Sequence, residues 1–87
     1  MISYRQYRAL YPDEQAQVLW QEGVYLELIR YTRKSLVELY ALHDFYVEIF
    51  YDRLTEEPSS LKCFKQLKGL DPYLPQVPID NILSIIK

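Results

Sequence analysis

The sequence has few of the residues that most often mark a catalytic or metal site. It holds one cysteine, Cys63, and one histidine, His43, which excludes an internal disulfide and a zinc site built from cysteine and histidine. With only two glycines it also lacks a glycine-rich phosphate-binding loop. We expect Cys63 to point into the core as a small apolar residue. We expect His43 to face solvent at a loop tip.

The chain also lacks a long hydrophobic run and a large excess of charge of one sign. No stretch reaches the roughly 18 apolar residues of a membrane span, and no apolar stretch follows residues 1–5, so we expect neither a span nor a signal peptide. The net charge of −2 argues against a nucleic-acid binder, because such proteins are normally basic. A cytoplasmic protein without membrane or nucleic-acid partners is therefore expected.

Tyrosine is the residue type that stands out. There are nine tyrosines in 87 residues, within an ordinary globular composition of 49% hydrophobic and 25% charged residues. A tyrosine ring is apolar and its tip is polar, which suits a surface that is covered part of the time, although tyrosine also favours β-strands. The length predicts one domain over residues 1–87.

The first part of the chain predicts two helices. Ser3 suits the N-cap of a short helix over residues 4–10, and Pro12 is well placed to begin a second helix over residues 12–22. We expect Gly23 to end that helix in the left-handed conformation. Trp20 lies on its apolar stripe and is expected to pack against a sheet. The sheet residues that it should contact are Leu26, Leu39 and Val47.

Four later segments are rich in β-branched and aromatic residues and predict strands over 24–31, 35–42, 45–52 and 61–67. Their short connections favour antiparallel pairing of successive strands, and residues 53–60 read as a flexible loop. The predicted fold class is α+β: one N-terminal helix or two short ones packed on a four-stranded antiparallel β-meander, with a C-terminal tail or short helix. Residues 69–75 are expected to be irregular or a single helical turn. The apolar residues Ile79, Ile82, Leu83 and Ile86, after a possible cap at Asp80, favour a last helix.

Strand alternation separates a charge-free face, which we assign to the core. Its members are Val24, Leu26, Leu28, Val37, Leu39, Ala41, Phe45, Val47, Ile49 and Tyr51. A first hairpin with its tip at Thr32 and Arg33, and a three-residue second loop over 42–44, predict three rows across the opposite, outer face. The rows are Tyr25–Tyr40–Tyr46, Glu27–Glu38–Glu48 and Ile29–Leu36–Phe50.

The glutamate row has three possible roles. It can serve as an acid–base pair, since neighbouring carboxylates raise one pKa, or bind a divalent cation through oxygen. No metal-loop motif or histidine partner supports either role, so we favour simple structural spacing and predict no catalytic residue, no metal and no cofactor. Like charges side by side repel, so a cation from Lys62, from Arg30 or from another chain is expected to offset them. The tyrosine row can stack nucleic-acid bases, but the adjacent glutamates would repel phosphate.

Three segments resemble short uncharacterised bacterial proteins of similar size. They are residues 19–23 (LWQEG), 39–52 (LYALHDFYVEIFYD) and 70–74 (LDPYL), and the resemblance covers residues 12–82. It implies an intracellular bacterial origin and no particular activity, site or substrate.

These patterns predict a non-enzymatic protein-interaction module that uses the outer face of its sheet. The predicted contact residues are Tyr25, Ile29, Leu36, Tyr40, Tyr46 and Phe50, and the partner is another protein or a second copy of the chain. The alternative is a small-molecule-binding or catalytic domain that uses the glutamate and tyrosine rows. A lined cavity favours that alternative, whereas a flat patch covered by a second chain favours the module. A third possibility is that the C-terminal tail covers the outer face.

Overall fold

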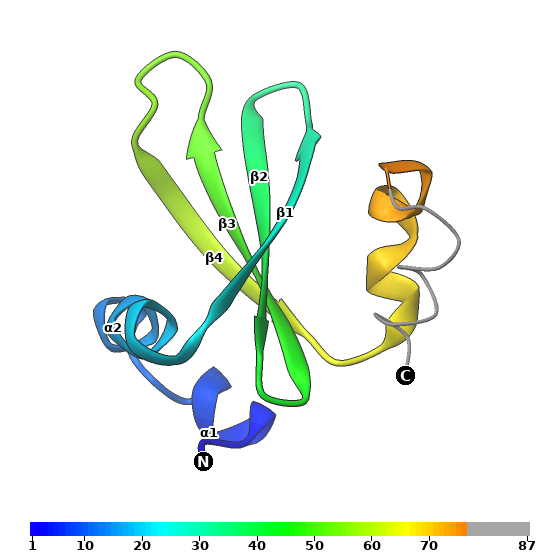
Figure 1. Cartoon of the computed structure of the whole chain (residues 1–87). Coiled ribbons are helices and arrows are strands. Elements are labelled where there is room, and N and C mark those ends of the chain that lie inside the picture. Colours follow the sequence, from blue (N-terminus) through cyan, green and yellow to red (C-terminus); the bar gives the residue numbers. More distant parts are fainter. Residues whose placement is uncertain (77–87) are drawn as a thin grey trace.

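The computed structural model describes residues 1–76, which form two helices, four strands and a 3₁₀ helix (Figure 1). The strands make one antiparallel sheet in the order β1-β2-β3-β4, which confirms the predicted α+β meander. The elements are α1 (Tyr4–Arg8), α2 (Pro12–Glu22), β1 (Val24–Tyr31), β2 (Ser35–Leu42), β3 (Phe45–Asp52), β4 (Pro58–Phe64) and η1 (Leu67–Gln76).

The helix starts follow the sequence signals, whereas α1 ends at Arg8, two residues earlier than predicted, and the predicted ending of α2 needs a correction. Ser3 caps α1, because its hydroxyl accepts from the Gln6 amide at 3.1 Å and the Gln6 side chain accepts from the Ser3 amide at 2.9 Å. Helix α2 has the predicted bounds. Gly23, however, is extended (φ −76°), so the left-handed ending was wrong. A Cβ at Gly23 would lie 2.6 Å from Leu19 Cδ1, so glycine serves close packing there.

The bounds of the first three strands match the prediction, whereas β4 begins and ends three residues earlier than predicted. The connection is a tight turn rather than a long flexible loop. The Asp52 carboxylate accepts from the amides of Leu54 at 2.8 Å and Thr55 at 3.1 Å, which folds the chain back at once. Pro58 can therefore already pair with Tyr51.

The predicted pairing of β1 with β2 is correct where β1 begins and shifts farther along the strand. Tyr25 pairs with Tyr40 as predicted, but a bulge follows and Leu28 pairs with Leu39. Glu27 lies in this bulge with a φ of 59°, a left-handed conformation that strand residues rarely adopt. The prediction that Glu27 faces Glu38 was therefore wrong.

The register of the second hairpin is displaced by one residue along its whole length. His43 and Asp44 alone form the turn, so Leu42 pairs with Phe45 and the predicted three-residue loop was wrong. The turn is possible because His43 adopts a φ of 58°. A shift of one residue moves every side chain of β3 to the other face relative to β2. Glu48 consequently pairs with Leu39, not with Glu38.

The sheet therefore has apolar residues on both faces, and among residues 1–76 the helices α1, α2 and η1 each cover only part of a face. Helices α1 and α2 pack on one face, hereafter the helix side, where Tyr7, Leu19, Leu42, Phe45, Val47 and Ile49 form a buried cluster. The 3₁₀ helix η1 packs on the other face, hereafter the η1 side, where Leu28, Leu39, Leu70 and Tyr73 are buried together. The single charge-free core face was wrong, because Val37 and Leu39 lie on the η1 side.

Trp20 does not pack against the sheet, and that prediction was wrong. Its side chain is 80% exposed, whereas its neighbour Leu19 is 2% exposed and fills the space below α2. Cys63 packs against the helix-side cluster as expected. His43 is in the predicted turn, but its ring is not fully in solvent: Nε2 lies 2.8 Å from Glu22 Oε1.

The C-terminal part of the described chain docks onto the sheet. Helix η1 is longer than the single turn allowed for residues 69–75, and its apolar residues Leu70 and Tyr73 are buried on β1 and β2. Gln76 then pairs with the edge of β1, where its side-chain amide accepts from the Ile29 amide and donates to the Ile29 carbonyl oxygen. The apolar stripe from Ile79 to Ile86 lies outside the described residues.

Candidate interaction face

The six predicted contact residues do not share one face. Tyr25, Ile29, Leu36 and Tyr40 lie on the helix side, while Tyr46 and Phe50 lie on the η1 side. The shifted second hairpin is the cause, since it turned the β3 residues over. Tyr46 there stacks on Phe64 with ring centroids 5.4 Å apart, and Tyr40 stays beside Tyr25 at 5.1 Å.

The glutamate row does not exist. Glu27 is exposed in the β1 bulge, Glu38 is half-buried on the helix side, and Glu48 is buried on the η1 side. The three carboxylates are therefore not lateral neighbours, which removes the basis for a shared acid–base or metal site. Among residues 1–76, no three histidine, cysteine, aspartate or glutamate side chains are grouped so that they could hold a metal ion.

Glu48 has a structural role that its burial explains. Its Oε2 accepts from Arg30 Nε at 3.1 Å and from the Tyr73 hydroxyl at 2.6 Å, so Arg30, one of the cations considered for the glutamates, pairs with Glu48 alone. Lys62 pairs with Glu48 in the register, but its Nζ lies 5.3 Å from the centre of the Phe50 ring. Burial, and then the hydrogen bond to Glu48, raise the pKa of Tyr73. This cluster fastens η1 to the sheet.

A second group of side chains lies on the helix side at the border of the cluster under α1 and α2, where Tyr40 and Tyr51 still pack against that cluster. We call it the tyrosine face, and its members are Tyr25, Ile29, Tyr31, Leu36, Glu38, Tyr40 and Tyr51. None of the seven is buried, and Tyr31 is 65% exposed. Farther along the same side, Val47 and Ile49 are buried under the helices.

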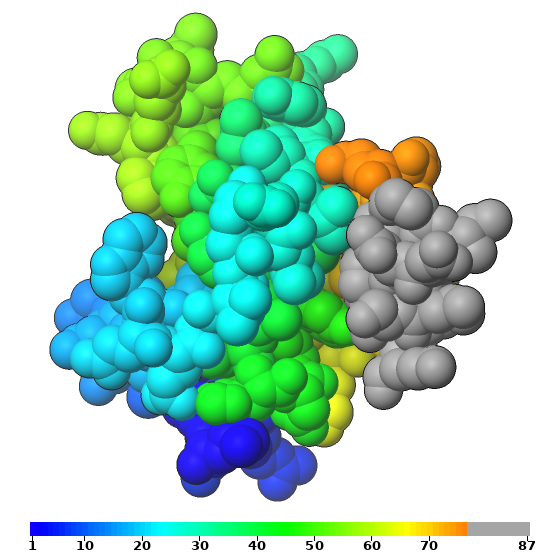
Figure 2. Space-filling view, in the orientation of Figure 1, coloured from blue at the N-terminus to red at the C-terminus, as the bar shows by residue number. Residues whose placement is uncertain are grey.

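The tyrosine face stays accessible because α1 and α2 pack near one end of the sheet. Figure 1 shows α1 and α2 at the end of the sheet where the β2–β3 turn lies, and the tips of the β1–β2 and β3–β4 hairpins at the other end. In the space-filling view, β1 lies at the surface between α2 and the η1 end, and the hairpin tips project beyond α2 (Figure 2).

Glu38 is the polar centre of the tyrosine face. The Tyr40 hydroxyl donates to Glu38 Oε1 over a long 3.5 Å. Burial raises the pKa values of Tyr25, Tyr40 and Tyr51, and the charge of Glu38 together with hydrogen bonds to it raises them further. At neutral pH these hydroxyls are therefore protonated donors, and the Glu38 carboxylate is the acceptor around which they gather.

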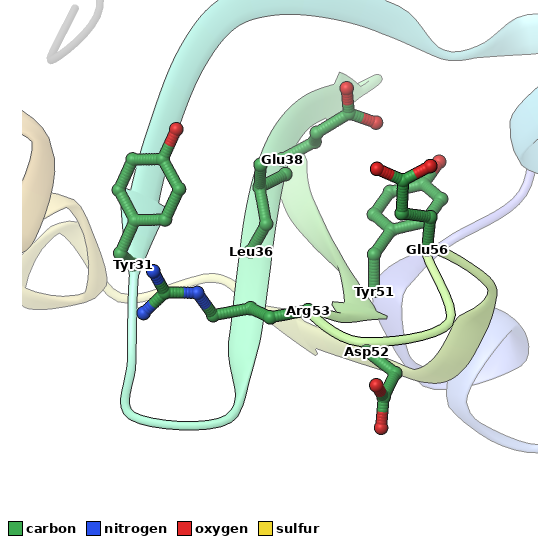
Figure 3. A pocket seen from close by; sticks show the side chains of 7 residues that line it. All are labelled: Tyr31, Leu36, Glu38, Tyr51, Asp52, Arg53 and Glu56. Atoms are coloured by element: carbon green, nitrogen blue, oxygen red, sulfur yellow. The ribbon is translucent and has the colours of Figure 1, made fainter.

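Two hollows flank the tyrosine face. The first, the Glu38 pocket, has a volume of about 360 Å³ and is lined by Tyr31, Leu36, Glu38, Tyr51, Asp52, Arg53 and Glu56 (Figure 3). The second, the α2–β4 groove, has a volume of about 410 Å³. It is lined by Pro12, Asp13, Ala16, Leu19 and Trp20 of α2, by Ile49 and Tyr51, and by residues 58–61 of β4. Tyr51 lines both hollows, so they adjoin.

Sequence reasoning missed the residues that build these hollows, namely Trp20, Tyr31, Tyr51, Arg53 and Glu56. Trp20 and Tyr51 had been assigned to the core. The direct connection of two β-rich segments by His43 and Asp44 is the signal that points to the correct register, because two-residue turns are the commonest hairpin connections. That register places Tyr51 beside Leu36 on the helix side.

Comparison with protein-family models, with curated proteins and with solved structures finds no match. In the part of the chain that the structure describes, no helix has the length and apolarity needed to cross a membrane.

Proposed function

We propose that this chain is a non-enzymatic protein-interaction module. It binds a segment of a partner protein through the tyrosine face and the adjoining α2–β4 groove. The observation that carries this proposal is the placement of the seven side chains of the tyrosine face. They occupy a part of the sheet that the N-terminal helices and η1 leave at least partly open: Tyr40 and Tyr51 pack against the helix-side cluster, but none of the seven is buried.

The composition of this surface supports a protein partner. Contiguous apolar patches on small proteins mark interaction sites, and tyrosine and tryptophan are enriched in them. The 80% exposed Trp20 borders the α2–β4 groove and offers a large aromatic anchor, a residue type that dominates binding energy at interfaces. A packing role in the core does not account for Trp20, because the residue is 80% exposed.

The sheet edges support an extended partner segment. The β1 edge is already engaged at Ile29 by the Gln76 side chain, whereas β4 is the other edge strand and its residues 58–60 are exposed. An edge strand next to a groove is the arrangement in which a peptide pairs with backbone and inserts alternate side chains.

A small-molecule site is the second candidate, and the Glu38 pocket favours it. Its volume falls in the range of roughly 300–1,000 Å³ that ligand pockets have. The pocket combines aromatic rings with carboxylates, which suits a small organic cation. A catalytic role has no comparable support, since the glutamate row on which it depended is dispersed over both faces of the sheet.

Selection from a displayed random-peptide library tests the module. We expect the wild-type protein to enrich a consensus sequence, and Trp20→Ala with Tyr31→Ala to lose that enrichment while remaining folded. The matched control is Leu54→Ala in the β3–β4 turn, where the side chain is 95% exposed and outside the face. The proposal would be overturned if the wild-type protein enriched no consensus, or if the double variant enriched the same consensus as the wild type.

Sedimentation over a range of concentrations separates a foreign partner from a second copy. A constant monomer mass is expected for a module that binds another protein. A dimer that Tyr31→Ala disrupts would instead make the occupant of the face a second copy of this chain and contradict the proposal of a different partner.

A further inference from the structure

The Glu38 pocket has aromatic sides and an apolar floor. In Figure 3 the rings of Tyr31 and Tyr51 stand on either side of Leu36, and they come from β1 and β3. Tyr31 is 65% exposed, so its ring is accessible to a bound group. A planar group of moderate size can therefore lie between or against these rings.

The pocket also has two carboxylates on the side of Tyr51, from Glu38 and Glu56 (Figure 3). Within residues 1–76 the ion pairs join Arg30 to Glu48, His43 to Glu22 and Lys65 to Asp44, and none of them involves Glu38 or Glu56. The third carboxylate of the pocket, Asp52, is directed away in Figure 3 and accepts from backbone amides of its own turn.

The cation of the pocket itself, Arg53, is engaged elsewhere. Its Nη1 donates to the Thr32 carbonyl oxygen at 3.2 Å, and its guanidinium lies 5.3 Å from the centre of the Tyr31 ring. Arg53 therefore lies on the Tyr31 side and leaves the carboxylates on the Tyr51 side without a cation from the described chain.

We infer that the Glu38 pocket receives the side chain of an arginine from the partner segment. This inference rests on the proposed function and assigns its specificity. The guanidinium would stack on the ring of Tyr51 and donate to the carboxylates of Glu38 and Glu56. The adjoining α2–β4 groove would take an apolar side chain of the same segment beside Trp20.

Arginine fits better than lysine for two reasons. Its guanidinium is planar, stacks on aromatic rings and donates in a fork that matches a carboxylate, whereas the lysine ammonium is a compact, strongly hydrated point charge. Within the chain, Arg30 and Arg53 lie over aromatic rings, at 5.5 Å from Phe50 and 5.3 Å from Tyr31, and Lys62 also lies over Phe50, so contacts between cations and aromatic rings are common in this protein.

The test is a titration of ¹⁵N-labelled protein with N-acetyl-arginine N-methylamide, followed by amide chemical shifts. A single side chain should bind in the millimolar range, with the largest shifts at Leu36, Glu38, Tyr51 and Glu56. The citrulline analogue has the same shape without the charge. It should bind roughly ten-fold more weakly, and the lysine analogue should fall between the two.

Charge-neutral variants locate the binding. Glu38→Gln and Glu56→Gln should each weaken the arginine probe by roughly three- to ten-fold, as expected for partly exposed ion pairs. The matched control is Glu57→Gln, one residue along the same turn but outside the pocket, and it should leave the affinity unchanged. Glu56 is exposed, so its variant keeps the test valid if Glu38→Gln destabilises the fold.

The outcomes distinguish this inference from the function on which it rests. Equal binding of the arginine and citrulline probes, or no effect of either glutamine variant, overturns the arginine pocket. A library consensus that depends on Trp20 and Tyr31 but contains no arginine overturns it too, and leaves the interaction module standing. Arginine binding without any enriched peptide overturns the module, and assigns the pocket to a free small molecule.

Discussion

Removal of a single hydroxyl group, in Tyr73→Phe, tests the packing of η1 on the sheet. Tyr73 is 1% exposed and its hydroxyl donates to the buried Glu48 carboxylate at 2.6 Å. The substitution keeps the ring in its site and removes one hydrogen bond to a charged group, which is worth about 1.5–3 kcal/mol. Arg30 still donates to Glu48, so the carboxylate keeps one partner.

That loss is large for a domain of this size. Stabilities of small domains are about 5–15 kcal/mol, and each kcal/mol shifts the melting temperature by about 4–8 °C. We therefore expect Tyr73→Phe to lower the melting temperature by on the order of 10 °C. The control is Tyr11→Phe, because the Tyr11 side chain is 74% exposed and should change the unfolding free energy by less than about 0.5 kcal/mol.

The pH dependence gives a second readout of the same hydroxyl. Burial raises the pKa of Tyr73 above its ordinary value of 10.0, so the folded protein holds this proton more tightly than the unfolded chain. The stabilisation is fully present below a pH of about 10 and is lost as the pH rises toward the folded-state pKa. Chemical unfolding at several pH values should show a shallower alkaline loss for Tyr73→Phe. An unfolding free energy within about 0.5 kcal/mol of wild type would refute the buried bond.

Other substitutions and one titration test separate features of the fold. Trp20→Ala should cost less than about 0.5 kcal/mol because the ring is exposed, whereas Leu19→Ala should cost about 2–5 kcal/mol, both read from denaturant midpoints. Gly23→Ala should cost about 1–3 kcal/mol, since its Cβ would overlap Leu19, and a neutral effect would contradict that contact. Glu27→Gly should be neutral or stabilising by up to about 1 kcal/mol because it relieves a positive φ, and a clear loss of stability would count against the bulge. In an ultraviolet titration of the folded protein, Tyr7 should ionise near the pKa of about 12 to which burial raises it, and ionisation of Tyr7 near pH 10, as in an unfolded chain, would contradict that burial.

Local signals predicted the elements of this fold well. The β-rich segments gave the bounds of β1, β2 and β3, and Ser3 and Pro12 marked the helix starts. These features depend on neighbouring residues only, through capping, turn chemistry and strand preference. The sequence therefore predicts where the backbone is helical or extended.

The faces of the sheet could not be predicted in the same way. They depend on the number of residues in each turn and on the bulge at Glu27, and an error of one residue reverses a strand. The assumption of one charge-free face favoured the wrong register. It took no account of η1, which covers the second face and supplies Tyr73 to the buried Glu48. With that cover, both faces can carry apolar residues.

The sequence predicted an accessible aromatic surface on the sheet, but only some of the residues that form it. Tyr25, Ile29, Leu36 and Tyr40 do share a face with accessible aromatic side chains, whereas Tyr46 and Phe50 belong to the η1 side. The strand register determines which other tyrosines lie on the same face as these four residues. Tyr31 and Tyr51 complete the tyrosine face only because Leu36 pairs with both.

Binding of a partner segment to the tyrosine face can be seen directly in an amide chemical-shift map of the labelled protein with the peptide that the library selects. We expect the largest changes at Tyr31, Leu36 and Tyr51 and at the Trp20 indole, with Leu70 and Tyr73 on the η1 side unchanged. Changes centred on η1, with the tyrosine face unaffected, would contradict this expectation.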